Sequence, residues 1–137
     1  MQNSVDSKVS VLINFGTIKN MTETEAVLDK AKQYGKIIKA RMYVEQEEMD
    51  LNREVITEIS KLGIEPVITI LAKNVRLAID LLDDAYDENV DIIVIIHDRE
   101  DIIPALMQAK TLKQLVLIVP TKAPKSFHTV TDEVVEI

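Results

Sequence analysis

Side chains that can bind or react gather directly after three of the apolar runs in this 137-residue sequence. The segments are Asn14 to Thr17, Lys73 with Asn74, and His97 to Asp101. An imidazole with an ordinary pKa near 6.5 can act as an acid or a base. No neighbour in the sequence supplies a partner that orients His97, so we favour a structural or surface histidine. The acids of the same segment either form part of a site or complement the N-terminus of a following helix.

Short apolar runs rich in β-branched residues predict the strands that carry these segments. The runs are Val9 to Ile13, Ile37 to Val44, Val67 to Ile70, Ile92 to Ile96, and Leu115 to Val119. Val134 to Ile137 is expected to add a short sixth strand after a loop from Thr121 to His128. Units of about 25 residues fit right-handed crossovers between parallel strands. The sequence therefore predicts an α/β fold: a three-layer α/β/α sandwich with a five- or six-stranded, mostly parallel sheet, in a single domain over residues 1–137.

Apolar residues at helical spacing predict four helices between the strands. The first follows a capping-box pair, Thr22 and Glu25, and ends at Gly35, while the second ends at Gly63. The apolar stripes of the second and fourth helices are Leu51, Val55, Ile59 and Leu62, and Ile102, Ala105, Leu106 and Ala109.

The third helix is expected to begin after Asn74 as its N-cap. Its predicted core stripe consists of Val75, Ala78, Ile79, Leu82, Ala85 and Tyr86. The aspartates of this helix then fall on a flank expected to face solvent; they are Asp80, Asp83, Asp84 and Asp87. Leu77 and Leu81 lie beside the stripe, where they either pack under a neighbouring helix or form a homodimer surface.

The composition excludes several classes of function. Because no cysteine is present, the chain has no disulfide framework, no thiolate nucleophile and no cysteine-based metal site. Three glycines are too few to build a phosphate-binding glycine loop alongside the helix stops. A formal net charge of -7 argues against sequence-blind wrapping of duplex nucleic acid but allows a local basic cleft. The polar N-terminal segment indicates no signal peptide, and no apolar run is long enough to span a bilayer, so we expect a cytoplasmic protein without membrane association.

Five segments together resemble the NYN domain family, a branch of the PIN-like nuclease superfamily. They are Leu12 to Ile18, Gly63 to Val67, Val75 to Asp80, Asn89 to Asp91, and Asp101 to Pro104. In order and spacing they are most similar to the small stand-alone NYN proteins of archaea, from Val9 to the end of the chain. The resemblance implies a cluster of carboxylates at the strand ends that holds Mg²⁺ or Mn²⁺ and activates water for RNA hydrolysis.

Most of the acids that the resemblance implies are replaced in this chain. Asn14 stands where an aspartate should follow the first strand, and Asn74 where one should open the third helix. Arg99 stands at the first of two aspartates expected after the fourth strand, and Lys73 adds another cation. These changes remove the negative charge that would hold a divalent cation. The acidic site is therefore degenerate.

One hypothesis is a non-catalytic NYN domain in RNA metabolism that binds RNA or a partner protein and needs no cofactor. The residues expected to line its cleft are Asn14, Thr17, Lys73, Asn74, His97 and Arg99. Basic residues of the second strand and second helix either solubilise the surface or form a path for single-stranded RNA; they are Lys36, Lys39, Arg41, Arg53 and Lys61. The aromatic content of 4 % offers no pattern for base stacking.

The alternative hypothesis is a weak Mg²⁺- or Mn²⁺-dependent ribonuclease. The resemblance retains Asp101, and Asp98 lies next to the substituted position. Asp98 and Asp101 would hold the metal, with Asp80 of the third helix completing the catalytic set. A metal-activated water would then attack the phosphodiester bond.

Overall fold

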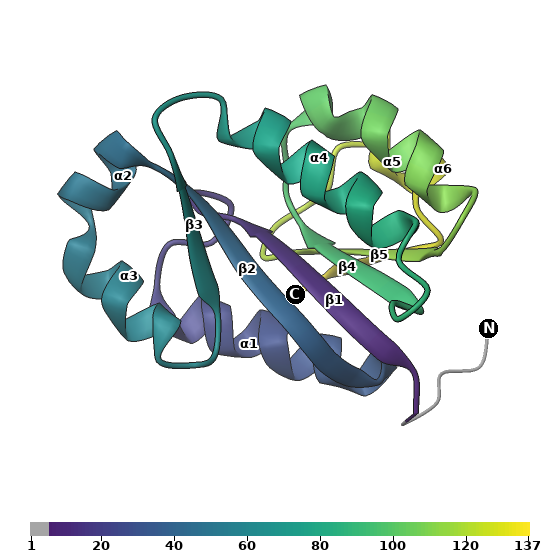
Figure 1. The fold of residues 1–137 in the computed structure, drawn as a ribbon, viewed down its shortest axis with the longest axis horizontal. Helices are drawn as coiled ribbons and strands as arrows, with labels where there is room; N and C mark the ends of the chain where they lie inside the picture. The colour runs from purple at the N-terminus through teal and green to yellow at the C-terminus, as the bar shows by residue number, and fades with distance from the viewer. Residues whose placement is uncertain (1–5) are drawn as a thin grey trace.

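The computed structural model describes residues 6–137 and places six parallel strands in one sheet (Figure 1). The strands are β1 (Lys8–Asn14), β2 (Lys36–Glu45), β3 (Glu65–Thr69), β4 (Ile92–Ile96), β5 (Gln114–Val119) and β6 (Glu133–Glu136). Their order in the sheet is β3-β2-β1-β4-β5-β6, so the direction of the crossovers reverses between β1 and β4. The five predicted strands and the expected sixth are all present. The start of the polar N-terminal segment lies outside the described residues.

Helices cover both faces of this sheet (Figure 1). They are α1 (Met21–Ala31), α2 (Gln46–Leu51), α3 (Arg53–Ser60), α4 (Lys73–Ala85), α5 (Ile103–Lys110) and α6 (Phe127–Val130), with 3-10 turns η1 (Lys32–Tyr34) and η2 (Glu100–Ile102). Successive residues of β1 face opposite sides: Val11 and Ile13 join a core with α1 and α3, while Leu12 joins a core with α4 and α5. The three-layer sandwich is therefore confirmed.

The start and end of the first helix differ in how closely they follow the sequence pattern. Asn20 is the N-cap of α1, because its side chain accepts the Glu23 backbone N–H at 2.8 Å. The predicted capping box at Thr22 and Glu25 is wrong by two residues. Gly35 does end the segment as expected, and it has φ +153°. A Cβ atom there would lie 2.3 Å from the Ser7 carbonyl oxygen, so only glycine fits.

The predicted second helix is broken in two. Asn52, with φ -131°, separates α2 from α3. As a result Leu51 is exposed rather than part of the core stripe, while Ile59 is buried as predicted. A smaller difference from the sequence prediction lies just before β6. The short helix α6 begins at Phe127, inside the segment that we expected to be a loop.

The rotation of α4 about its axis corrects the sequence prediction. Leu77 and Leu81 are fully buried in the core, so their interpretation as a homodimer surface is wrong. Asp80 and Asp84, expected on a solvent-facing flank, are also buried. Hydrophobic periodicity fails here because β2 presents polar side chains to α4, and the helix turns its aspartates towards them.

Those aspartates form an ion cluster with β2, which we define as Ser10, Lys39, Arg41, Tyr43, Asp80 and Asp84. Asp84 accepts hydrogen bonds from Ser10 Oγ and Arg41 Nη2, and Lys39 Nζ lies 3.3 Å from its Oδ1. The Tyr43 hydroxyl donates to Asp80 Oδ2 at 2.7 Å, and burial together with this bond raises the pKa of Tyr43.

The ion cluster also corrects the reading of the basic residues on β2. Lys39 and Arg41 pair with Asp84 of α4, and Lys39 also pairs with Asp87 just beyond this helix, so neither is a free path for RNA. In the part of the chain that the structure describes, we find no helix with the length and apolar character needed to cross a membrane.

Candidate functional site

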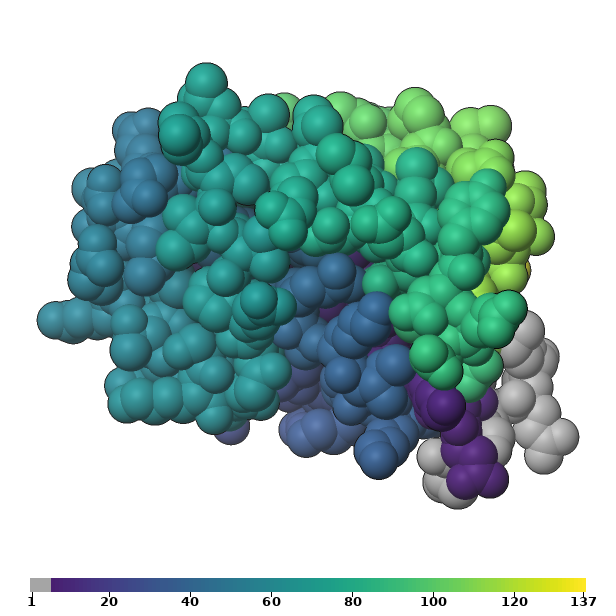
Figure 2. Space-filling model, viewed as in Figure 1, coloured from purple at the N-terminus to yellow at the C-terminus, as the bar shows by residue number. Residues whose placement is uncertain are grey.

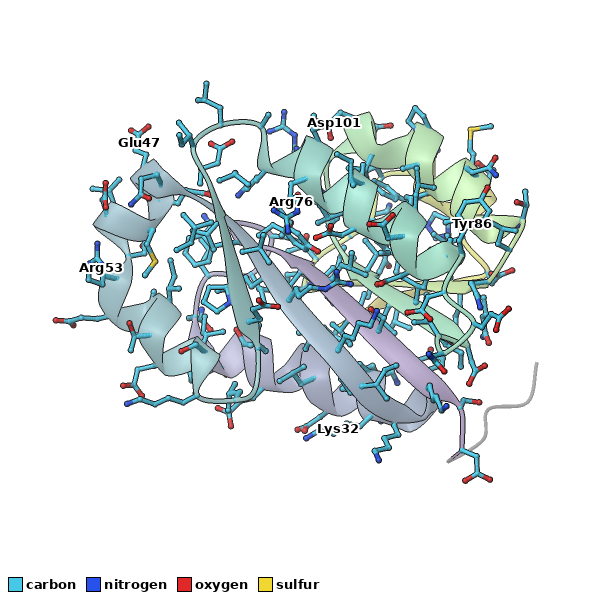
Figure 3. The ribbon with its side chains drawn as sticks, in the orientation of Figure 1. Lys32, Glu47, Arg53, Arg76, Tyr86 and Asp101 are labelled. Atoms are coloured by element: carbon cyan, nitrogen blue, oxygen red, sulfur yellow. The ribbon has the colours of Figure 1, made fainter. Side chains whose placement is uncertain are left out.

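A cleft of about 710 Å³ lies at the carboxyl ends of β1, β2 and β4, beside the start of α4. Figure 3 shows Glu47 at one end of this edge of the sheet, on α2, and Asp101 at the other. The charged and amide side chains that line the cleft are Asn14, Lys19, Glu45, Glu47, Glu48, Asn52, Lys73, Asn74, Asp98 and Arg99. This is where ligands bind in open α/β sheets, near the point where strand order reverses.

The end of β1 holds Asp98 in a short chain of hydrogen bonds. Asn14 Nδ2 donates to Thr17 Oγ1 at 2.9 Å, and the Thr17 hydroxyl donates to Asp98 Oδ1 at 2.9 Å. Asn14 is only 5 % exposed, and its Oδ1 has no hydrogen-bond partner among residues 6–137. The structure therefore brings Asn14, Thr17 and Asp98 together, and one lone pair of Asp98 is already engaged.

A second chain of hydrogen bonds links the end of β4 to α4. His97 is fully buried, and its Nδ1 accepts the Arg99 backbone N–H at 3.0 Å. The ring proton must then be on Nε2, which donates to Asn74 Oδ1 at 2.9 Å. Asn74 Nδ2 in turn donates to Asp101 Oδ2 at 3.0 Å. Burial lowers the pKa of His97 to about 4, so the ring is neutral near pH 7.

Asn74 is thus not the N-cap that the sequence suggests. The residue before α4 is Ala72, in the left-handed conformation with φ +58°, and in the described part of the chain no side chain caps the helix. The amide of Asn74 is used for the buried ring of His97 and for Asp101 instead. His97 is fully buried, so it is not a surface histidine, and it is not among the residues that line the cleft, where we expected it from sequence.

The cation at the start of α4 is neutralised by an acid that sequence reasoning missed. Lys73 Nζ lies 2.8 Å from both carboxylate oxygens of Glu48 and also donates to the Phe15 carbonyl. Glu45 accepts the Lys73 backbone N–H at 3.2 Å. Glu45 and Glu48 form the capping box of α2 at the end of β2. The spacing Glu-x-x-Glu directly after an apolar strand is the signal that could have identified them.

Asp80 lies apart from the other two acids of the ribonuclease hypothesis. Its partners are Tyr43, Arg41 at 3.5 Å and Arg76 at 3.2 Å, all on β2 or α4. The structure gives it no contact with Asp98 or Asp101 among the described residues. It belongs to the ion cluster, so the structure does not assemble the three proposed acids at one point.

The donor set of the cleft does not fit a divalent cation. Asp98 and Asp101 are held by different partners, and the Lys73 ammonium lies in the same cleft. Within residues 6–137 no group of three or more Asp, Glu or His side chains is placed to hold a metal ion. Mg²⁺ and Mn²⁺ favour several oxygen ligands, mainly carboxylates, and repel a neighbouring ammonium.

Two cations of the cleft are free to meet a ligand. The side chains of Lys19 and Arg99 form no ion pair in the described part of the chain, and both residues are exposed.

A hollow of similar size, about 660 Å³, lies at the amino ends of the strands. Its Lys113 is bound to the carbonyls of Asp87 and Val90, and it contains none of the predicted site residues.

The six-stranded parallel sheet, helices on both faces and a polar cleft at the strand ends define an α/β domain of the PIN-like type. A family model described as "NYN domain" matches residues 8–137, and the chain belongs to the NYN family. NYN domains are nuclease-type domains in RNA metabolism.

The fold also matches a solved structure, a protein of unknown function from Vibrio parahaemolyticus. The TM-score is 0.76 at 16 % sequence identity, and the match covers 100 % of this chain and 96 % of the other. No match is found among curated proteins. At this level of identity the structural likeness supports the fold alone.

Proposed function

We propose that this NYN domain binds single-stranded RNA at the strand-end cleft without cleaving it. One observation carries the proposal: Asp98, Asp101 and Glu48, at or beside the cleft, are each engaged by a different partner and do not converge. Thr17 holds Asp98, Asn74 holds Asp101, and Lys73 holds Glu48. A nuclease that uses a metal needs such acids free and close together.

Support for RNA as the ligand comes from the family and from the free cations of the cleft. Lys19 and Arg99 lie on its lining without an ion pair among the described residues. Two phosphate contacts to a single strand predict a slope of log K against log salt of about -1.4, because each contact contributes about -0.7. Binding is expected to be weak and to need no cofactor.

The cleavage test uses labelled single-stranded and structured RNA incubated with Mg²⁺ or Mn²⁺. The expected result is intact RNA with the wild-type protein in either metal. Asp101→Ala is the matched variant, because Asp101 is the acid that the family pattern retains. Cleavage by the wild type that disappears in this variant would overturn the non-catalytic proposal in favour of the ribonuclease.

The binding test measures fluorescence anisotropy of the same RNAs over a series of salt concentrations. Arg99→Glu is expected to weaken binding at least tenfold, because it reverses the charge of an exposed residue in the cleft. Lys61→Glu is the control, because Lys61 is exposed just beyond the last residue of α3 and, among residues 6–137, forms an ion pair with Glu58 alone. Equal effects of both variants, or no binding of any RNA, would overturn the proposal that the cleft binds RNA and would favour a protein partner.

The reciprocal test restores two acids of the family pattern with Asn14→Asp and Arg99→Asp together. The local charge becomes more negative, and we expect Mn²⁺ to bind this variant at least tenfold more tightly than the wild type. Calorimetric titration gives both affinities, and Mn²⁺ should raise the melting temperature of the variant alone. Equal affinities would show that the substituted acids do not explain the poor fit to a metal.

A further inference from the structure

The outer face of α4 carries a row of apolar side chains exposed to solvent. Val75 is 60 % exposed, Ile79 53 % and Tyr86 66 %. Figure 2 shows the teal to green surface of this helix uncovered on the front of the molecule. The row coincides with the stripe that hydrophobic periodicity predicts as core, although Leu77 and Leu81 occupy the core instead.

A helix with two apolar faces is unusual for the surface of a monomer. At 100° per residue, Val75, Ile79, Leu82 and Tyr86 fall within a sector of about 60°. This sector points away from the sheet, whereas a surface helix normally shows one apolar stripe and a polar opposite face. Contiguous exposed apolar side chains of this kind mark interaction surfaces. We call this sector, with its flanking charges, the α4 outer face.

The charges that flank the row are self-complementary. Arg76 and Asp83 are seven residues apart, which places them about 20° apart around the helix and about two turns apart along it. Arg76 uses its Nε to bind Asp80, and its Nη groups have no partner among residues 6–137. Asp83 is exposed and has no partner in the same part of the chain. Figure 3 shows Arg76 projecting from the flank of α4, with Tyr86 at its far end.

Two-fold symmetry turns this pattern into a matched pair of surfaces. Ile79 lies close to the midpoint between Arg76 and Asp83 along α4, three residues after the first and four before the second. A two-fold axis that passes beside Ile79, between two copies of α4, makes the second α4 run antiparallel to the first. Arg76 of one copy then meets Asp83 of the other, twice, and the apolar rows face each other. An isologous contact requires this kind of self-complementarity.

We propose that two copies of this chain pair through the α4 outer face, with antiparallel helices, Ile79 at the two-fold axis and Arg76 facing Asp83 of the second copy. The pairing does not depend on the ligand of the strand-end cleft. It also differs from a surface built on Leu77 and Leu81, which are inside the core.

The first test measures molar mass by light scattering during size exclusion, over a hundredfold range of protein concentration. The wild type is expected to approach about 31 kDa, twice the chain mass of 15.5 kDa. Ile79→Glu should give the monomer mass at every concentration. Leu51→Glu is the matched control, because Leu51 is an exposed apolar residue on α2 and its replacement should leave the dimer intact.

The second test exchanges the charges. Asp83→Lys places a lysine opposite Arg76 and should yield a monomer, and Arg76→Glu should do the same by opposing Asp83. An equimolar mixture of the two variants should recover the dimer mass, because both contacts then join opposite charges. Circular dichroism and thermal unfolding check that each variant is folded; if Arg76→Glu unfolds, Ile79→Glu and Asp83→Lys decide the matter.

A wild type that stays monomeric at the highest concentration would overturn the proposal and assign the α4 outer face to a different protein. A dimer that survives both Ile79→Glu and Asp83→Lys would overturn it as well, because the two copies would then meet elsewhere.

Discussion

Replacing Asp84 by alanine tests whether the ion cluster is truly part of the core. Asp84 is 1 % exposed and accepts hydrogen bonds from Ser10, Arg41 and Lys39. Removing one partner of a buried ion pair costs about 3–5 kcal/mol, because the remaining charge stays buried without compensation. The ion cluster therefore predicts a large loss of stability from a single polar side chain.

The remaining contacts place the expected value at the lower end of that range. Without Asp84, Arg41 keeps Asp80 at 3.5 Å and Lys39 keeps Asp87 at 3.0 Å. We therefore expect Asp84→Ala to lower the free energy of unfolding by about 3 kcal/mol. A domain of this size loses about 4 °C in melting temperature per kcal/mol, so the expected fall is about 12 °C.

Urea unfolding followed by circular dichroism measures the free energy directly. Asp29→Ala is the matched control, since Asp29 is an exposed aspartate on α1 whose closest cation, Lys32, lies 3.9 Å away. Its replacement should change the free energy by no more than about 0.5 kcal/mol. If Asp84→Ala costs less than about 1 kcal/mol, or no more than Asp29→Ala, the reasoning about the ion cluster is refuted.

Two further predictions concern His97 and the glycines. Because the pKa of His97 is about 4 in the folded chain, against about 6.5 when unfolded, the unfolded state binds the extra proton. The contribution of His97 to the free energy of unfolding is complete above pH 6.5 and falls by up to about 3 kcal/mol towards pH 4. In urea titrations at a series of pH values, His97→Gln should flatten this dependence of the free energy of unfolding on pH, whereas His128→Gln should not. Gly35→Ala should cost at least about 2 kcal/mol more than Gly63→Ala, because its Cβ meets the Ser7 carbonyl while nothing lies within 4 Å at Gly63; equal melting temperatures for the two variants would contradict this.

The sheet could be predicted from the sequence because its signal is local. Strands buried on both faces need continuous apolar runs, and each run of the chain became a strand. The sixth strand has a shorter apolar run, since Glu133 and Glu136 flank only two valines, yet it pairs in parallel with β5. The NYN resemblance likewise rests on segments near strand ends, and the family match bears it out.

The orientation of α4 could not be predicted because it depends on a partner far away in the sequence. Arg41 and Asp84 are 43 residues apart. Periodicity evaluates the helix alone, so it assigned Asp84 to solvent and Ile79 to the core. The aspartates became internal only because β2 supplies the cations that neutralise them.

The candidate site was predicted in part for the same reason. The rule on strand ends directs attention to Asn14, Asn74 and Asp98, which line one cleft. It omitted Glu45 and Glu48, since the end of β2 was not considered. The partner of each side chain, such as Asn74 between His97 and Asp101, depends on three-dimensional contacts that spacing does not reveal.

The ion cluster has a consequence for how this sequence selects one packing. Helix α4 offers two apolar faces to the sheet, one with Leu77 and Leu81 and one with Val75 and Ile79, so hydrophobic burial alone discriminates poorly between two rotations. In the alternative rotation Arg41 would face aliphatic side chains and lose its carboxylates, at a cost of several kcal/mol. The cluster thus selects one rotation of α4, and it leaves the second apolar face outside, where another molecule can use it.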